Sequence, residues 1–591
     1  MQLNIPDFES PLIKEQISRI KEAFGTPSIS CGVLHHGQAF VSATCAILAH
    51  EGVLSWDSPV SNYLPEFVTP ADEIVGQRAT LADLCSHGTG LAPIDHAVMG
   101  FWDEFYGDGA DQVAVSARLP VVYDFRSRFL YNNSMMGVAG EVIREVCGKS
   151  TGTVLKEKIL APLGLTRTCT SAAEYPADGN VAIGYSVLDD GSVLPLRDPH
   201  CRDGSVQAGA GFVRSTVNDM LRWAKAVMDS EKAEARGETP LLPGISFTRC
   251  AHRPLVMEDG LGENSYGMGW FRHTLPSRWL SSIGPNSKLL DDDPPVIGKN
   301  SPPRLALAHY GEFGGFLAAF YTFPATDSAI VVLANSAQSR GDPTDLIAQA
   351  LCQELFDMRP RVALDQYARE SARRAGLRWS ALVREWEANR VPGTRMRNPA
   401  DYVGTYTNEG FKLAIRVYLL PDSAAAARSG GNNNPELLGF QVNGLPRQTA
   451  KLRHYHYDTW TFLPESRDDA SRKGMELYLA LPYVLLEFKR GHDDRVCALE
   501  WDLQGGDCEG PAPGLDSLVK PVRFERHPVQ AVTGLVGVLL AGGTELDAAA
   551  AVVPILPLKD PPLQRRSHRN GTILRPENLG GSRRRSFDEV F

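Results

Sequence analysis

A charged segment between residues 359 and 400 divides this chain of 591 residues into two parts with different hydrophobic patterns. Before it, apolar residues recur at helical spacing or gather in short buried runs, which predicts a mixture of helices and strands. After it, from Tyr402 to about residue 527, short stretches alternate between apolar and polar residues, which predicts β-strands. The segment itself is rich in Arg and Glu and predicts a helical connector. A chain of this length is expected to form more than one domain.

Composition and charge exclude several classes of function. A hydrophobic content of 43% and a charged content of 22% are typical of an ordinary globular protein. The formal net charge of −10 argues against nucleic acid as the main partner. The longest apolar stretch, residues 529–543, contains four glycines and is too short to span a bilayer, so we expect no membrane partner.

The ten cysteines are scattered singly, without any Cys-x-x-Cys pair. This spacing indicates neither a zinc site nor a disulfide framework, so we expect no metal and no cofactor. The first residues carry no basic start followed by an apolar run, so no secretory signal is expected. These observations predict a cytoplasmic protein. His454 and His456 share a predicted strand at residues 452–457, but no third ligand lies at metal-binding spacing, which favours packing over metal binding.

Three motifs follow one another in the first part of the chain. They are the turn Leu84-Cys85-Ser86-His87-Gly88-Thr89-Gly90-Leu91, the triplet Tyr131-Asn132-Asn133, and His309-Tyr310-Gly311 followed by Gly314-Gly315-Phe316. In order and spacing they resemble L-L-S-H-x-S-G-L, Tyr-x-Asn and Lys-Thr-Gly of the serine β-lactamases and penicillin-binding proteins. The part after the connector is similar to the lipocalin-like β-barrel that follows the hydrolase domain in many relatives.

The resemblance implies an α/β (α+β) fold over residues 1–358, with an antiparallel sheet flanked by helices and a helical subdomain. Residues 359–400 would be the connector, residues 401–527 a small all-β barrel, and residues 528–591 a disordered basic tail. Residues 230–305 are rich in Pro, Gly and Asp and are expected to form loops over the active site, around Trp270.

The resemblance also assigns roles to single residues. Tyr131 would share proton transfer with a lysine, and Asn133 would hold a substrate carbonyl. His309 replaces the family's lysine; imidazole is neutral near pH 7, which favours esters or amides over carboxylate-bearing substrates. Gly311, Gly314 and Trp270 would contact the substrate, Gly311 by letting its backbone approach the strand edge. Two alternatives stay open: Tyr131 as a core residue, and Asn133 as the cap of the following helix.

The nucleophile and its base are missing from the expected place. Where Ser-x-x-Lys should open a helix, the chain reads His35-His36-Gly37-Gln38, and the helix continues from Ala39. A serine hydroxyl needs a base within hydrogen-bond reach, and glutamine cannot accept its proton. A hairpin and the start of the catalytic helix therefore look deleted between residues 38 and 39.

No displaced pair replaces this motif convincingly. Ser18 and Lys21 have the spacing but lie within a surface helix whose apolar stripe is Leu12, Ile13, Ile17, Ile20 and Phe24. Ser517 and Lys520 lie outside the hydrolase part. Ser150 matches a Gly-x-Ser-x-Gly elbow but follows a predicted helix rather than a strand.

Two hypotheses remain. Either the gene encodes a hydrolase or transesterase for a small-molecule acyl substrate and this sequence lacks one of its segments, or the chain is a catalytically dead protein that binds a ligand or partner. In both cases the chain as printed should not perform serine catalysis. Oligomeric state is left open.

Overall fold

The computed structural model describes residues 11–29, 37–198, 201–255, 264–278, 280, 284, 286–290, 294–421, 436–475, 479–504 and 519–527. All of them belong to one compact unit that ends at His527. The predicted tail at residues 528–591 lies outside the described residues. Within the described part, none of the helices is long and apolar enough to cross a membrane.

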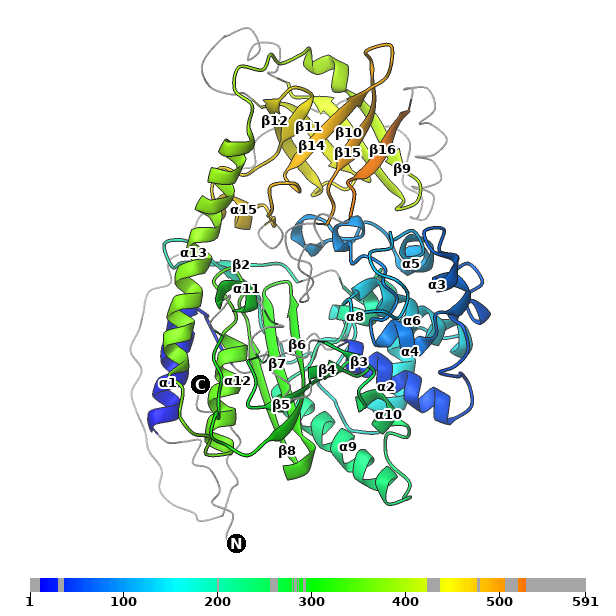
Figure 1. The fold of residues 1–591 in the computed structure, drawn as a ribbon, viewed down its shortest axis with the longest axis vertical. Coiled ribbons are helices and arrows are strands. Elements are labelled where there is room, and N and C mark those ends of the chain that lie inside the picture. The colour runs from blue at the N-terminus through cyan, green and yellow to red at the C-terminus, as the bar shows by residue number, and fades with distance from the viewer. Residues whose placement is uncertain are drawn as a thin grey trace. The chain divides into compact units, whose positions relative to one another are not determined.

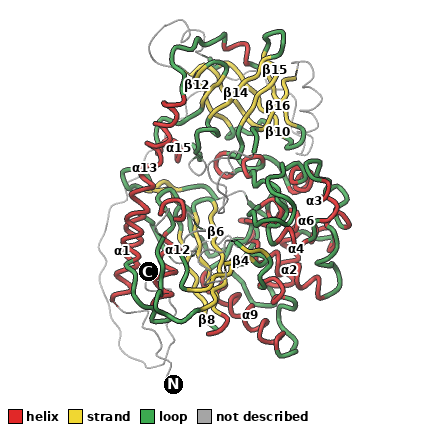
Figure 2. Tube along the Cα trace, in the orientation of Figure 1, coloured by secondary structure: helices red, strands yellow, loops and turns green. Residues whose placement is uncertain are grey.

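A six-stranded antiparallel sheet forms the centre of the first part (Figures 1 and 2). Its strands run side by side in chain order: β3 (Arg253–Pro254), β4 (Asn264–Tyr266), β5 (Phe271–Leu275), β6 (Arg304–Phe313), β7 (Phe316–Phe323) and β8 (Ser328–Ala334). Strand β7 is buried along its whole length, as expected for a strand covered on both faces. The sequence predicts strands at residues 305–309, 318–323 and 329–335, and strands β6, β7 and β8 confirm them.

Helices from both ends of the first part cover one face of the sheet. Their apolar side chains and those of β7 form one buried cluster. The helices are α1 (Pro11–Phe24), α11 (Asn286–Leu290), α12 (Pro343–Leu355) and α13 (Leu364–Asn389). Helix α1 buries Ile13, Ile17, Ile20 and Phe24 as predicted, whereas Leu12 is 80% exposed and does not belong to the stripe.

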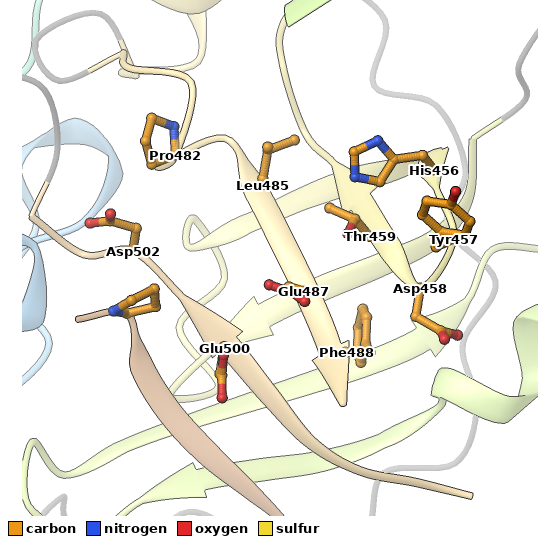
Figure 3. Close-up of a pocket in the computed structure, with 11 residues that line it drawn as sticks. His456, Tyr457, Asp458, Thr459, Pro482, Leu485, Glu487, Phe488, Glu500 and Asp502 are labelled. Carbon is orange, nitrogen blue, oxygen red and sulfur yellow. The ribbon is translucent and has the colours of Figure 1, made fainter. Parts of the chain in front are cut away.

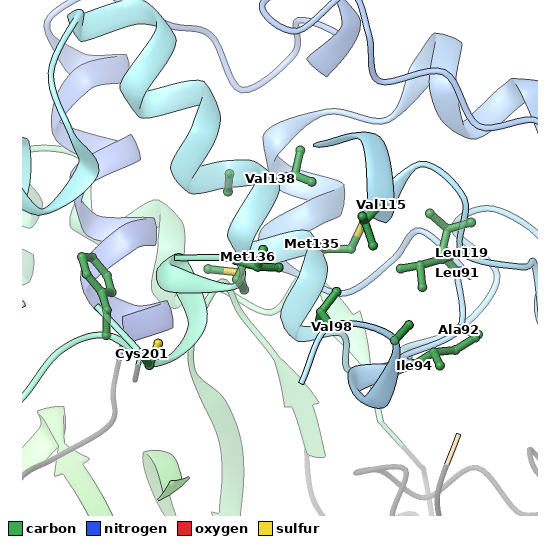
Figure 4. Packing of buried hydrophobic residues seen from close by; sticks show 14 of the residues in the cluster. Leu91, Ala92, Ile94, Val98, Val115, Leu119, Met135, Met136, Val138 and Cys201 are labelled. Carbon is green, nitrogen blue, oxygen red and sulfur yellow. The ribbon is translucent and has the colours of Figure 1, made fainter. Parts of the chain in front are cut away.

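The second large cluster of buried side chains runs through a helical subdomain and continues into the barrel that follows; the part of it around α6 is shown in Figure 4. The helices of this subdomain are α2 (Gly37–His50), α3 (Glu73–Arg78), α4 (Leu81–Cys85), α5 (Gln112–Ser116), α6 (Asn133–Cys147), α7 (Thr151–Leu155), α8 (Ala208–Gly211), α9 (Val217–Ala235) and α10 (Ile245–Arg249). A short hairpin of β1 (Tyr185–Val187) and β2 (Val193–Pro195) lies within the same stretch of chain. Gly148 ends α6 in the left-handed conformation, as predicted for its C-cap.

The prediction that residues 230–305 form loops is wrong in part. This stretch contains the end of α9, helix α10 and the strands β3, β4 and β5. The strands are only two to five residues long and are separated by Gly and Pro, which hides their alternation in the sequence. Tyr266 and Trp270 therefore flank a tight connection between two strands of the sheet rather than a long loop.

The second part is a closed barrel of eight antiparallel strands. They are β9 (Gly404–Asn408), β10 (Leu413–Leu419), β11 (Glu436–Val442), β12 (Thr449–His456), β13 (Thr459–Thr461), β14 (Leu485–Arg490), β15 (Val496–Trp501) and β16 (Val522–His527), with β16 paired to β9. Helix α15 (Arg467–Arg472) lies between β13 and β14. Large side chains such as Phe440, Trp460 and Trp501 are completely buried and fill the interior. The strand predicted at residues 475–481 does not form in its described residues.

The connector is helical, as predicted, but it is not a free linker. Helix α13 buries Leu364, Ala368 and Ala375 against the first part of the chain, and its Trp386 indole donates to the Thr461 hydroxyl of the barrel at 3.3 Å. Whether the barrel folds on its own stays a prediction.

Candidate functional site

The turn after α4 carries a buried histidine. His87 lies in the left-handed region at φ 57° and is completely covered. Gly90 follows at φ 73°, where a Cβ atom would lie only 2.0 Å from the Tyr123 carbonyl oxygen, so only glycine fits. The His87 carbonyl accepts the Leu130 amide at 2.9 Å, which joins the turn to the start of α6.

The start of α6 places Tyr131 against this turn. Asn132 is the N-cap: its side chain accepts the Ser134 amide at 3.0 Å, and its backbone amide donates to His87 Nδ1 at 3.2 Å. The alternative in which Asn133 caps the helix is therefore wrong. Asn133 instead donates through Nδ2 to Asp95 Oδ2 at 3.1 Å. The Tyr131 ring lies 4.5 Å from the His87 ring, centroid to centroid.

Strand β6 brings His309 to the same place. Its Nδ1 donates to the Tyr310 carbonyl at 2.6 Å, which leaves Nε2 as the acceptor for the Tyr266 hydroxyl at 3.5 Å. The His309 ring lies 6.4 Å from Tyr131 and 5.5 Å from Phe271. Thus the turn, the start of α6 and the sheet meet at one cluster of two histidines and two tyrosines, which we call the acyl site: His87, Tyr131, Tyr266 and His309.

Burial keeps both histidines of the acyl site neutral. Loss of solvent, together with a smaller effect of the nearby His309, lowers the pKa of His87 to about 3. Burial likewise lowers the pKa of His309 to about 4. The charged form of imidazole is disfavoured where water is excluded. At neutral pH the site therefore offers two uncharged imidazoles and two phenols.

The two arginines next to this turn form ion pairs with one aspartate. Asp83, in α4, accepts from Arg126 at 2.7 and 2.8 Å and from Arg253 at 2.7 Å. The guanidinium of Arg253 packs so closely on Gly88 that a Cβ atom there would lie 2.4 Å from it. These two cations brace the turn, and the single carboxylate of Asp83 offsets one of their two positive charges.

The structure also places the three predicted substrate contacts. Gly311 lies on β6 opposite Ala318, two residues beyond His309, and Gly314 lies at φ 54° in the turn to β7. Trp270 is completely buried, with the Arg249 guanidinium 4.3 Å from its ring. It is not brought into the aromatic cluster, and its role in substrate binding stays a prediction that its burial does not favour.

His35 and His36, which occupy the expected place of the nucleophile motif, lie outside the described residues, as does the side chain of Gln38. Of the alternative serines, Ser18 hydrogen-bonds Glu22 within exposed α1, and Ser150 caps α7. Ser517 lies outside the described residues. None of the described alternatives is shown in contact with Tyr131 or His309.

His87, Tyr266 and Asp95 are site residues that sequence reasoning missed. His87 was visible as part of the turn motif, and the glycine that follows it signals an unusual backbone. Tyr266 precedes Gly267 in a stretch predicted as loop, and nothing local distinguishes Asp95. These contacts arise only when three distant segments fold together.

A hollow of about 410 Å³ lies on the barrel, away from this site (Figure 3). Glu487 and Glu500 from neighbouring strands line it, and both lie within ion-pair distance of Lys489. His456 borders it and accepts the Val391 amide, while His454 contacts the Tyr457 carbonyl. The part of the chain that the structure describes contains no group of side chains arranged to hold a metal ion.

A model of the β-lactamase family matches residues 38–353, more than half of the chain. The chain belongs to the β-lactamase family. This agrees with the acyl site, which joins the family's turn, Tyr-x-Asn and His-x-Gly motifs. The family's fold and the closed barrel after it confirm the fold that the sequence predicts.

Curated relatives include hydrolases. The unguisins hydrolase of Aspergillus violaceofuscus is 23% identical over 344 residues, covering 54% of this chain and 55% of the relative. That of Aspergillus campestris is 28% identical over 197 residues, covering 32% and 36%. A β-lactamase of Escherichia coli is 28% identical over 212 residues, covering 35% and 51%. The chain thus spans about half or less of the length of these relatives.

Among solved structures, the octameric penicillin-binding protein homologue of Pyrococcus abyssi aligns with 83% of this chain and 96% of its own, at 17% identity and a TM-score of 0.48. A class C β-lactamase of Rhodobacter sphaeroides aligns with 59% of this chain and 99% of its own, at 21% identity and a TM-score of 0.43.

Proposed function

We propose that the acyl site is that of a serine hydrolase or transesterase for an uncharged ester or amide, and that the chain as printed binds such a compound without cleaving it. The observation that carries the proposal is the joining of His87, Tyr131, Tyr266 and His309 into one buried cluster. Of the serines considered as nucleophiles, Ser18 and Ser150 lie in other described elements, within α1 and at the start of α7. The hydrolase names of the relatives support the reaction class.

The neutral imidazoles support an uncharged substrate. A carboxylate entering the site would lose its hydration among neutral imidazoles and phenols, while the nearby guanidinium groups of Arg126 and Arg253 are paired with Asp83. An ester or amide carbonyl needs only a hydrogen-bond donor. Asn133, Tyr131 and Tyr266 bring amide and hydroxyl groups of the kind that donate such a bond.

The reaction requires a nucleophile that the printed chain does not supply. In the complete enzyme, the serine hydroxyl would attack the carbonyl carbon while its proton passes to the neighbouring lysine amine. That proton would then pass from the lysine through the Tyr131 hydroxyl to the leaving group, which departs and leaves the acyl group on the serine. A concerted set of this kind loses most of its rate when one member is removed.

A fluorophosphonate probe tests the chain as printed. We expect no covalent adduct by intact mass spectrometry, because no described serine lies beside a base at a helix start. The chain should become labelled once a family segment ending in Ser-x-x-Lys is inserted between Gln38 and Ala39. The same insert with alanine in place of serine is the matched control. Stoichiometric labelling of the printed chain would refute the proposal.

Within the restored enzyme, Tyr131→Phe tests the proton-transfer role. We expect kcat/KM for a neutral ester to fall by two to four orders of magnitude, roughly 3–5 kcal/mol, while the protein stays folded. The control is Phe129→Leu, which changes a neighbouring aromatic residue without removing a hydroxyl. It should lower kcat/KM much less. A Tyr131→Phe enzyme that kept most of its rate would show that the phenol does not take part.

Ligand binding alone is the second candidate function, and it is favoured by the persistence of the site without its nucleophile. It predicts that the printed chain binds a methyl ester more tightly than the corresponding free acid, measured by calorimetry. His309→Lys would place a cation in the site and should reverse that preference. Equal affinity for ester and acid, unchanged by His309→Lys, would contradict recognition by this cluster.

A further inference from the structure

One loop connects the acyl site with the barrel. Residues 95–106 fold back on themselves: Met99 and Phe105 form an antiparallel bridge, the Tyr106 amide donates to the Val98 carbonyl at 2.8 Å, and the Gly100 amide donates to the Glu104 carbonyl at 3.0 Å. We call this segment the bridging loop. Because hydrogen bonds within its own backbone hold the loop together, we expect a shift at one end of the loop to move the other end.

Barrel side chains hold the tip of the bridging loop: the rings of Phe440 and Phe462 contact that of Phe101, and Gln448 makes the hydrogen bonds there. Gln448, between β11 and β12, is completely buried. Its Oε1 accepts the Phe101 amide at 2.8 Å, and its Nε2 donates to the Phe101 carbonyl at 2.8 Å and to Glu104 Oε2 at 2.7 Å. One amide group thus satisfies both backbone groups of Phe101 and one carboxylate.

The bridging loop and the barrel pack closely against each other around Gln448. A Cβ atom on Gly100 would lie 2.2 Å from Gln448 Oε1 and 2.3 Å from the Tyr106 hydroxyl. On the barrel side, the Gly474 carbonyl accepts the Trp102 amide at 2.8 Å, and a Cβ atom on Gly474 would lie 2.4 Å from the Trp102 ring. Both contacts require glycine.

The backbone of the bridging loop is unusual where the barrel holds it. Trp102 and Asp103 both lie in the left-handed region, at φ 63° and 51°. Non-glycine residues in this region persist when surrounding contacts determine them, and such residues gather at functional sites. Here those contacts come from Gln448 and Gly474.

The other parts of the bridging loop touch the acyl site's own elements. Asp95 accepts Nδ2 of Asn133 at 3.1 Å through one oxygen and Nε2 of Gln207 at 2.7 Å through the other. Asp103 lies beside the backbone of Gly314 in the β6–β7 turn, which partly offsets the rise in its pKa caused by burial. Phe105 stacks on Phe313 with ring centroids 6.2 Å apart.

We propose that Gln448 is a positioning residue for the acyl site: it fixes the bridging loop so that Asp95 orients Asn133 and Asp103 orients the turn at Gly314. The barrel is then part of the substrate-binding machinery and not an appended module. The inference rests on the proposed function only in taking Asn133 and the β6–β7 turn as substrate-facing. Its distinctive consequence is that a change in the barrel should loosen the start of α6.

Hydrogen exchange of the full printed chain, followed by mass spectrometry, tests this without any catalytic activity. In Gln448→Leu, amides of residues 95–106 should exchange faster, and so should those of residues 131–135 and 311–316, by roughly tenfold for a loss of about one hydrogen bond's stabilisation. Gln441→Leu is the matched control, because Gln441 lies on the same barrel and donates only to the Leu445 carbonyl. It should leave all three segments unchanged.

Gly100→Ala approaches the same contact from the loop side and should give the same pattern. Faster exchange confined to residues 95–106, with residues 131–135 and 311–316 unchanged in both variants, would overturn the proposal. So would a failure of both variants to fold, since the contact would then support the fold rather than the site. If the restored enzyme proves inactive, the proposed function fails, but the exchange result stands by itself.

Discussion

Protonation of His87 should destabilise the protein, because its ring nitrogen serves as an acceptor. Nδ1 receives the backbone amide of Asn132 at the start of α6, and the ring is completely buried. A proton on Nδ1 would remove that bond and place a charge in an apolar site. Asparagine is the informative replacement, since it tolerates the left-handed backbone and does not titrate.

The size of the effect follows from the pKa. His87 has a pKa of about 3 in the folded protein against 6.5 as its ordinary value. The unfolded chain therefore binds the proton first, so the stabilisation is complete above pH 6.5 and is lost as the pH falls toward 3. A pH of 5 lies about 1.5 units below the pKa of the imidazole in the unfolded chain. The folded protein therefore loses about 2 kcal/mol of its free energy of unfolding at this pH.

Urea unfolding at pH 8 and pH 5 measures this loss. Between these pH values, wild type should lose about 2 kcal/mol more than His87→Asn. Burial raises the pKa of both Asp103 and Asp342 to about 7, which acts in the opposite sense, but it does so in both proteins and cancels in the comparison. His492→Asn, in an exposed turn, is the control. Parallel pH profiles for wild type and His87→Asn would refute the reasoning.

Three further changes test how the site is held. Asp83→Asn should destabilise the fold by about 3–5 kcal/mol in urea unfolding, because it leaves two guanidinium groups without their carboxylate; Asp178→Asn, in an exposed pair, should change little. Gly90→Ala should cost more than about 2 kcal/mol, since the left-handed backbone and the Tyr123 carbonyl both exclude a methyl group; an unchanged unfolding midpoint would contradict this. Trypsin should cut first in the exposed loop after α13, at residues 395–397, and spare the helix itself; early cleavage within α13 would contradict its packing.

The sequence predicted the fold where the hydrophobic period was long and regular. Helix α6, strands β6 to β8 and four of the eight barrel strands (β10, β12, β13 and β14) have clear periods and were predicted to within a few residues. Strands β3, β4 and β5 are short and interrupted by Gly and Pro, so no window is long enough to reveal their alternation. Leu12 lies on the exposed side of α1, which spacing alone did not separate from its buried neighbours.

Motifs identified part of the candidate site, and tertiary contacts supplied the rest. Tyr131 and His309 were found because they occur in ordered triplets. The link from Asn133 to Asp95 joins residues 38 apart, and that from Gln448 to Phe101 joins residues 347 apart. Neither residue type is unusual in a loop, so no local pattern marks them. Such contacts depend on which surfaces meet after folding.

The contacts that build the acyl site explain why it can persist without its nucleophile. His87 is fixed by the Asn132 amide, its turn is braced by Asp83, and His309 is fixed by the backbone of its own strand. None of these bonds involves residues 35–38, where the sequence departs from the family's pattern. Under the proposed function, absence of a Ser-x-x-Lys segment would therefore remove the attacking group and leave in place the bonds that position the groups around it. For the same reason, insertion of that segment alone should restore activity. If further changes in the turn or on β6 were also needed, the positions of the other site residues would no longer suit the reaction.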